Sequence, residues 1–162
     1  MSENQNNAGW IPELEIEDAQ IKWAFSHIDG REDRFNEAGE HNFQLIIPED
    51  RVEELRAQGW VIRSLDGYEE GDPQEHLLKV KISFKYEPPR IFMIRNGRKF
   101  RVESPRDLSD VNRSTTKRID LVVTPSRWTY GRDTGVTAYV KEMYATVTGS
   151  RFADKYADFE EV

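Results

Sequence analysis

The residues best suited to chemistry lie in one internal segment, residues 79–132, where cationic side chains alternate with aromatic rings. Single-stranded nucleic acid exposes a charged backbone, which cations can follow, and base faces, on which rings can stack. Duplex binding would not need the rings. The pattern therefore predicts a surface for single strands, with these candidate DNA contacts: Lys79, Lys81, Lys85, Tyr86, Arg90, Arg95, Arg98, Lys99, Arg101, Lys117, Arg118, Arg127, Trp128, Tyr130 and Arg132.

Charge is divided unevenly along the chain, whose 162 residues carry a net charge of −7. Residues 79–132 hold fourteen Lys and Arg against five Asp and Glu, whereas the rest holds nine basic and twenty-five acidic residues. A basic segment between acidic ends favours a face that binds a polyanion. The alternative is that these cations pair with nearby acids on a solvated surface.

The rings of the basic segment are expected to divide between core and surface. Because Phe is mostly buried in proteins, Phe84 and one of Phe92 and Phe100 are expected in the core. The better stacking candidates stand at strand ends beside Pro or Gly, where loops carry function: Tyr86, Trp128 and Tyr130. The other tryptophans lie in acidic or apolar surroundings and are interpreted as anchors of the core or the arm: Trp10, Trp23 and Trp60.

Catalytic patterns find little support in the sequence. The three histidines are scattered without metal-ligand spacing, and the chain has no cysteine. No glycine-rich phosphate loop and no Gly-x-Ser-x-Gly elbow occurs. We therefore expect a binding protein rather than an enzyme, with no cofactor and no metal.

The elements that must position these residues are mostly strands. Alternating or continuous apolar runs predict strands at residues 20–28, 42–47, 60–65, 77–86, 119–124 and 135–148, and a helix from Pro48 to Gln58 that stops at Gly59. Asn96-Gly97 predicts a tight hairpin over residues 90–102 with a basic tip, since a type I′ turn needs positive φ at both central residues. Short strands, one helix and turns predict a compact β barrel or sandwich.

The two ends are polar and acidic, so three regions are expected: a flexible arm at 1–18, a nucleic-acid-binding domain at 19–149 and a tail at 150–162. In the tail, rings recur at helical spacing among acids. This stretch either engages partner proteins and covers the basic surface, or docks on its own domain. The candidate partner-binding residues are Asp154, Tyr156, Asp158, Phe159, Glu160 and Glu161.

The chain resembles phage-type single-stranded DNA-binding proteins built on the OB-fold. The resemblance covers roughly residues 20–148 and rests on stretches in order: 35–43, Gly59-Trp60-Val61, 78–84, Pro88-Pro89, 119–128 and 135–141. It implies a mainly β, OB-fold-like five-stranded barrel with one short helix and the protruding basic hairpin. It also implies sequence-tolerant binding of single strands in phage replication or recombination without a cofactor. The family's acidic tail usually serves protein partners, but here it ends in Val162 rather than in an aromatic residue.

Other functions stay open at this point. The barrel could be an RNA-binding OB module, because discrimination of the sugar depends on one or two contacts to the 2′-hydroxyl. It could instead be a viral structural or scaffold protein with a basic surface facing the genome, or, with less support, a nuclease. No apolar run approaches the ~20 residues of a membrane span. We expect a protein of the host cytoplasm that binds no membrane, with homo-oligomers left open.

Overall fold

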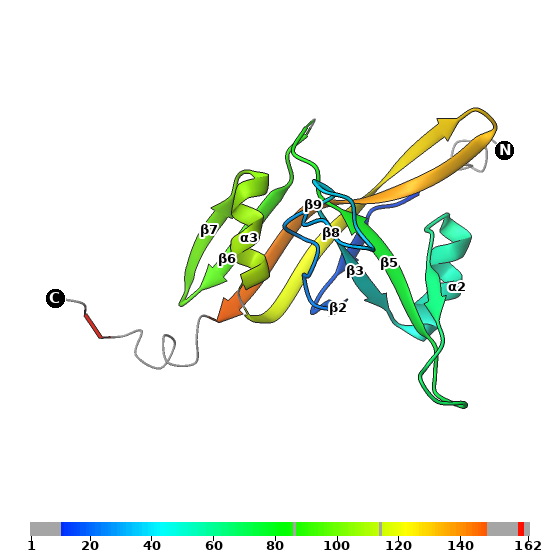
Figure 1. Cartoon of the computed structure of the whole chain (residues 1–162), viewed down its shortest axis with the longest axis horizontal. Helices are drawn as coiled ribbons and strands as arrows, with labels where there is room; N and C mark the ends of the chain where they lie inside the picture. Colours follow the sequence, from blue (N-terminus) through cyan, green and yellow to red (C-terminus); the bar gives the residue numbers. More distant parts are fainter. Residues whose placement is uncertain (1–10, 86, 114, 149–158, 161–162) are drawn as a thin grey trace.

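The computed structural model describes residues 11–85, 87–113, 115–148 and 159–160. Strands dominate this part of the chain, which confirms the mainly β prediction (Figure 1). The strands are β1 (Leu14–Ile16), β2 (Gln20–Lys22), β3 (Asn42–Ile47), β4 (Arg63–Leu65), β5 (Glu75–Lys81), β6 (Arg90–Arg95), β7 (Arg98–Val102), β8 (Thr115–Tyr130) and β9 (Asp133–Thr148). The helices are α2 (Glu49–Gln58), a single 3-10 turn η1 (Pro105–Asp107) and α3 (Leu108–Arg113).

The strands pair in the order β1-β8-β9-β5-β3-β2, with β4 beside β5 and the β6–β7 hairpin beside β9. Most pairs are antiparallel, but β5 and β6 each run parallel to β9. The two ends of this path, β1 and β2, are separated by only residues 17–19, and the amide of Ala19 donates to the carbonyl of Ile119 over 2.7 Å. The sheet therefore curls until its two ends meet at one bent segment, as in a partly open barrel.

The expected counts of five strands and one helix differ from those of the structure. The described residues form nine strands in one sheet, and two helices. One cause is that β1 and β2 are two halves of a bent segment, each bonded to a different neighbour. Another cause is that three further strands join the sheet beside the main path, β4 by pairing with β5 and the β6–β7 hairpin by pairing with β9. Residues 104–112, expected as a loop or one helical turn, form η1 and most of α3.

The domain also begins earlier than expected. Residues 11–18 were assigned to the arm, yet β1 pairs with β8, and Ile11 and Leu14 are buried in the core. With them pack the inward residues of the central strands, among them Leu45, Val80 and Met143. Residues 1–10, including Trp10, lie outside the described part.

Helix α2 begins after Pro48 and ends at Gly59, as predicted. Gly59 has φ 110°, a left-handed conformation that glycine adopts readily, and its amide donates to the carbonyl of Arg56. Val52 and Leu55 are the buried face of the helix. Buried His76 of β5 contacts Glu49 of α2, while its Nδ1 lies 2.7 Å from Ser64 Oγ of β4. This histidine therefore joins α2 to both strands and serves the fold.

Candidate nucleic-acid interface

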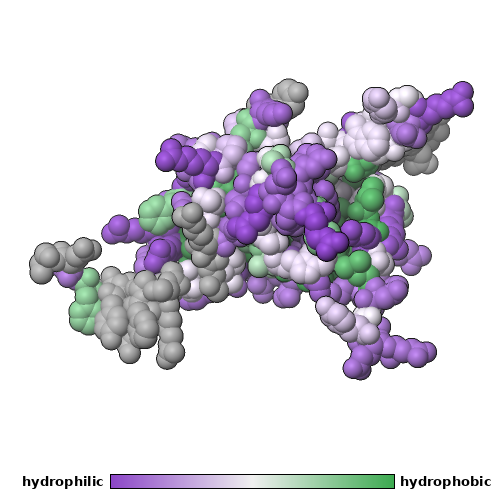
Figure 2. Space-filling model, in the orientation of Figure 1, coloured by the Kyte–Doolittle hydropathy of each residue, from purple (hydrophilic) through white to green (hydrophobic). Residues whose placement is uncertain are grey.

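A groove of about 940 Å³ lies between strands β3, β4 and β5 and the loop that connects β2 to β3. In Figure 2, green hydrophobic patches are exposed among purple hydrophilic side chains on the half of the molecule that holds β3, β5 and α2. The groove combines exposed rings, apolar side chains and cations. Its lining is Trp23, Ser26, His27, Arg31, Asp33, Phe35, Asn42, Gln44, Val61, Arg63, Leu65, Leu77 and Lys79.

Phe35 stands at the tip of the connecting loop with 80 % of its surface exposed. Asp33 and Asn36 bond to each other through their backbones over 3.0 and 3.3 Å, so Arg34 and Phe35 form a tight turn between them. The guanidinium of Arg34 lies 5.4 Å from the centre of the Phe35 ring. An aromatic ring is thus held out toward solvent at the rim of the groove, with a cation beside it.

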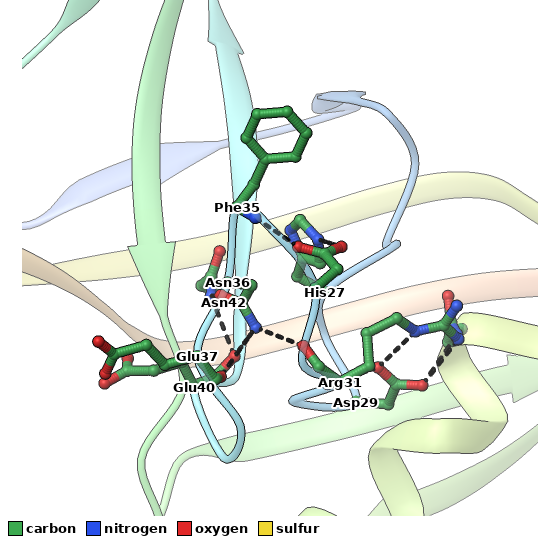
Figure 3. A network of polar contacts seen from close by, with 10 residues as sticks. His27, Asp29, Arg31, Phe35, Asn36, Glu37, Glu40 and Asn42 are labelled. Atoms are coloured by element: carbon green, nitrogen blue, oxygen red, sulfur yellow. Dashed lines mark hydrogen bonds and ion pairs between the residues drawn. The ribbon is translucent and has the colours of Figure 1, made fainter.

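Two asparagines hold the base of this loop (Figure 3). Asn36 Nδ2 donates to the carbonyls of Arg31, Glu37 and Glu40 at 2.8 to 3.2 Å. Asn42 Nδ2 donates to Asn36 Oδ1 at 2.8 Å and to the carbonyl of Glu40 at 3.0 Å. Both asparagines are buried, so these bonds satisfy polar groups that would otherwise be costly to bury. The loop is consequently rigid at its base although its tip is exposed.

Asp33 fixes the tip from the inside of the turn. Its Oδ1 accepts from the amide of Phe35 at 2.8 Å, and its Oδ2 lies 2.5 Å from His27 Nε2. The hydrogen bond from His27, and then that from the Phe35 amide, hold the pKa of Asp33 below its ordinary value. The carboxylate is therefore charged at neutral pH and held by both contacts in one orientation, although it remains partly exposed.

Asp29 ties the same loop to α3. Its carboxylate accepts from the guanidinium of Arg31 at 2.9 and 3.2 Å and from Asn112 Nδ2 at 3.1 Å. The bonds from Arg31 lower the pKa of Asp29, against the opposing effect of burial. Arg31 thereby lines the groove as a positioned cation rather than a mobile one.

Trp23 is exposed over 56 % of its surface in an unusual backbone conformation. Its φ is 58° and that of Ala24 is 50°, in the left-handed region that residues with a Cβ rarely adopt. Backbone strain of this kind is concentrated at functional sites. The strand expected over residues 20–28 ends at Lys22 for this reason, and the interpretation of Trp23 as a buried anchor was wrong. Trp60, by contrast, is buried as expected.

The three lysines predicted on one strand are placed differently from one another. Lys79 is exposed on β5 and lines the groove. Lys81 ends the strand and has its Nζ 3.7 Å from a carboxylate oxygen of Glu40. Lys85 is exposed but lies beyond β5. The strand was expected to continue to residue 86, but β5 ends at Lys81. Tyr86 lies outside the described residues.

The tip of the long β8–β9 hairpin carries a second group of candidates. Trp128 is 46 % and Tyr130 81 % exposed, and Arg127 and Arg132 are exposed beside them. Trp128 pairs with Gly135 across the hairpin, and a Cβ at Gly135 would lie 2.3 Å from an indole carbon. The absence of a side chain at this position lets the indole lie across β9.

The predicted basic hairpin is formed by β6 and β7 around Asn96 and Gly97, whose φ angles are 50° and 73°. Phe92 is buried there and Phe100 half exposed, while Phe84 packs against the core, which confirms the division expected for these rings. The candidate cations here are exposed or half-buried: Arg90, Arg95, Arg98, Lys99 and Arg101.

The remaining candidates lie apart from the groove. Lys117 and Arg118 line a smaller cavity of about 450 Å³ where β2 approaches the start of β8, and Arg118 forms an ion pair with Asp120 at 3.2 Å. Of the tail candidates, Phe159 and Glu160 are described and exposed, whereas Asp154, Tyr156, Asp158 and Glu161 lie outside the described residues.

The groove contains candidate residues that the sequence analysis did not predict. Trp23, Arg31, Phe35 and Arg63 all lie outside the basic segment on which that prediction rested. A glycine-bounded, charged loop with one aromatic residue was the signal available for Phe35. Arg31 and Arg63 had no signal, because Arg31 stands among acids and Arg63 stands alone in an apolar stretch, and both reach the groove only through the fold.

Neither a membrane-spanning helix nor a metal-binding cluster occurs among the described residues. Over the ranges described, no helix is long and apolar enough to span a membrane. The same part of the chain contains no group of three or more His, Asp or Glu side chains arranged to hold a metal ion.

Comparison with solved structures shows a shared fold. The single-stranded DNA-binding protein from bacteriophage Enc34 superposes with a TM-score of 0.52 and 10 % identity, over 82 % of this chain and 79 % of that one. The same Enc34 protein in complex with ssDNA superposes equally well, with a TM-score of 0.52, 10 % identity and coverage of 82 % of this chain and 85 % of that one. No curated protein sequence matches the chain.

At the level of sequence, the profile of the phage ssDNA-binding domain family matches residues 3–162. This match spans nearly the whole chain of 162 residues. The chain therefore belongs to the phage ssDNA-binding domain family.

Proposed function

We propose that this chain is a sequence-independent single-stranded DNA-binding protein that acts in phage DNA replication or recombination. The observation that carries the proposal is the groove, in which exposed Trp23 and Phe35 face the same cavity as Lys79. Family membership and the fold shared with a phage protein whose structure was solved in complex with ssDNA support it.

The groove is suited to bases that are not paired. Rings stack on any base, because every base has an aromatic face, and each stacked base contributes about 1–3 kcal/mol. Arg63 and Lys79, which form no ion pair with a described acid, would neutralise phosphates along the same path. In small barrels of this kind, the central strands and the flanking loops form the surface that binds oligonucleotides. The β8–β9 tip, with Trp128 and Tyr130, would extend that surface.

The proposed role is to coat and protect exposed strands without a chemical step, so neither cofactor nor metal takes part. Replication or recombination proteins would dock on the acidic tail, residues 150–162. Such work would place the protein in the cytoplasm of the host.

The test compares ring-deletion variants in fluorescence-anisotropy titrations with single-stranded DNA. Trp23→Ala and Phe35→Ala should each weaken binding by about 1–3 kcal/mol, and both should retain the thermal transition of the native chain. Tyr68→Ala is the matched control, because Tyr68 is a fully exposed ring outside the groove. Duplex DNA and RNA of equal length complete the set.

Two results would contradict the proposal. Unchanged affinity in the double variant Trp23→Ala/Phe35→Ala would remove the groove as the binding site. Equal, weak binding of the native chain to single strands, duplex and RNA would favour a scaffold role instead.

A further inference from the structure

Three cations converge on one aromatic ring of the basic hairpin. The side-chain charges of Arg90, Lys99 and Arg101 lie 5.7, 4.6 and 5.8 Å from the centre of the Phe92 ring. The strand register explains the convergence, since Arg101 stands opposite Phe92 and Lys99 opposite Ile94. Tyr144 of β9, the neighbour of Phe92 on the other side, stacks on the ring at 5.4 Å and 14°. We call these five residues the Phe92 platform: Arg90, Phe92, Lys99, Arg101 and Tyr144.

The positive charge of the platform is only partly offset within the described part of the chain. None of its three cations has a described carboxylate within 4.0 Å, whereas Lys22, Lys141 and Arg118 elsewhere are paired with acids. Two described acids share this face: Glu142 stands opposite Arg90 in the register and accepts a 2.6 Å hydrogen bond from the Tyr144 hydroxyl, and Asp120 is paired with Arg118. Among the described residues, one carboxylate without a cationic partner therefore stands against three cations. Like charges held on neighbouring strands repel one another unless an anion lies between them. The platform is therefore organised for an anion.

The platform differs from the groove in what it can recognise. Phe92 is only 6 % exposed, because a second ring and the cationic side chains cover it. It cannot stack on a base, so it can only hold the cations in place. Such a surface contacts phosphates and is indifferent to the base attached to them. The groove, by contrast, presents its rings to solvent.

The platform is also separate from the groove. No residue of β6 or β7 lines the groove, and Figure 1 shows the β6–β7 hairpin on the opposite side of β9 from β3 and α2. We propose that the Phe92 platform is a second, phosphate-only binding site that holds the single strand where it continues beyond the groove. This inference rests on the proposed function and adds a length requirement to it. Strands that fill only the groove do not reach the platform.

The experiment uses the full chain and two oligonucleotides, one of about 4–6 nucleotides and one of about 16–20, near the two ends of the range that such a domain covers. The variant Lys99→Gln/Arg101→Gln removes two platform cations, and Arg51→Gln/Lys141→Gln removes the same charge elsewhere. Affinity is measured at several salt concentrations. On the long strand, the platform variant should lower the magnitude of the log–log salt slope by about 1.4, since each contact with a single strand contributes about 0.7. On the short strand it should behave like the control.

The outcomes separate the two proposals. An unchanged salt slope on the long strand overturns the proposal that the Phe92 platform binds phosphates of the single strand. The cations of the hairpin would then be available to bind an anionic protein surface. Equal loss on short and long strands overturns it as well, because the hairpin would then belong to the groove. If Trp23→Ala/Phe35→Ala abolishes short-strand binding while the platform variant has no length-dependent effect, the proposed function stands and this inference fails.

Discussion

At the scale of single residues, the position of the Trp128 indole depends on the lack of a side chain at Gly135. The indole occupies the space that a side chain at position 135 would need. Other strand residues of this hairpin carry side chains, so the glycine here serves packing rather than a turn. One face of Trp128 therefore lies on β9, and the other remains available to a ligand.

The first prediction is that Gly135→Ala displaces the indole and destabilises the protein by about 1 kcal/mol, as overpacking does. In a Trp128→Ala background the same change should be close to neutral, because the clash has gone. Thermal melts of the four members of this double-mutant cycle measure the coupling. Additive effects would mean that the ring does not depend on the glycine.

The second prediction concerns Trp128 as a contact. Trp128→Ala should weaken binding to single-stranded DNA by about 1–3 kcal/mol, the usual loss of one stacked base, and lower the melting temperature about as much as Gly135→Ala does. Titration and a melting curve on one preparation check both. A large fall in melting temperature would show instead that the ring supports the fold.

Residue types alone predicted part of the site. The core positions of Phe84 and Phe92 follow from the burial of Phe in general. The exposure of Trp128 follows from its place near a turn. The exposure of Trp23 could not be predicted, because the alternating pattern of residues 20–28 contains no signal for the two positive φ angles that end the strand.

At the scale of elements, the loop between β2 and β3 determines how the groove presents its rings. Its rigidity comes from Asn36, Asn42 and Asp33, which bond backbone groups of the loop or one another. The sequence shows only a charged stretch between glycines here. Such hydrogen bonds depend on long-range geometry, which composition and periodicity do not contain.

The third prediction tests this element. Asp33→Ala should weaken binding to single strands about fivefold, because the Phe35 amide loses its acceptor and the ring is less well positioned, at a cost of about 1 kcal/mol. Asp33→Asn keeps an oxygen for that amide and should bind more tightly than Asp33→Ala. Both variants remove the same charge, so titrations of the two isolate the hydrogen bond. Equal affinities would show that the loop needs no such support.

Regular elements were predicted better than irregular ones. Helix α2, the Asn96-Gly97 hairpin and strand β3 match their expected positions, since each is defined by local signals such as Pro, Gly or an apolar run. Strand β1 was missed, because three residues are too few to show alternation, and β2 begins where its strand was expected but ends at Lys22.

At the scale of the whole molecule, an acidic protein presents cations at the groove, the hairpins and the Phe92 platform. The tail adds to the contrast, with four acids against one lysine in residues 152–162. Tethered to the same chain, it is present at an effective concentration in the millimolar range. Even a weak attraction to the cationic surfaces would then compete with DNA.

The fourth prediction is that deleting residues 152–162 tightens binding to single-stranded DNA, most at low salt, where the attraction is least screened. Replacing the four acids by their amides in the full-length chain is the control for charge without loss of length. If the deletion lowers the melting temperature and leaves low-salt affinity unchanged, the tail packs on the domain instead of competing.

The curled sheet has a kinetic consequence. The pairs that complete it join residues far apart in sequence: Leu14 with Val123, Val80 with Ala138, and Ile91 with Met143. Strand β9 contributes to most of these contacts and is the last strand of the sheet along the chain. Contacts of such wide separation form slowly, since a long loop must close before any of them is made. During synthesis on the ribosome, pairs such as β3 with β5 and β6 with β7 can form early, but the sheet cannot be completed until β9 has emerged to join them.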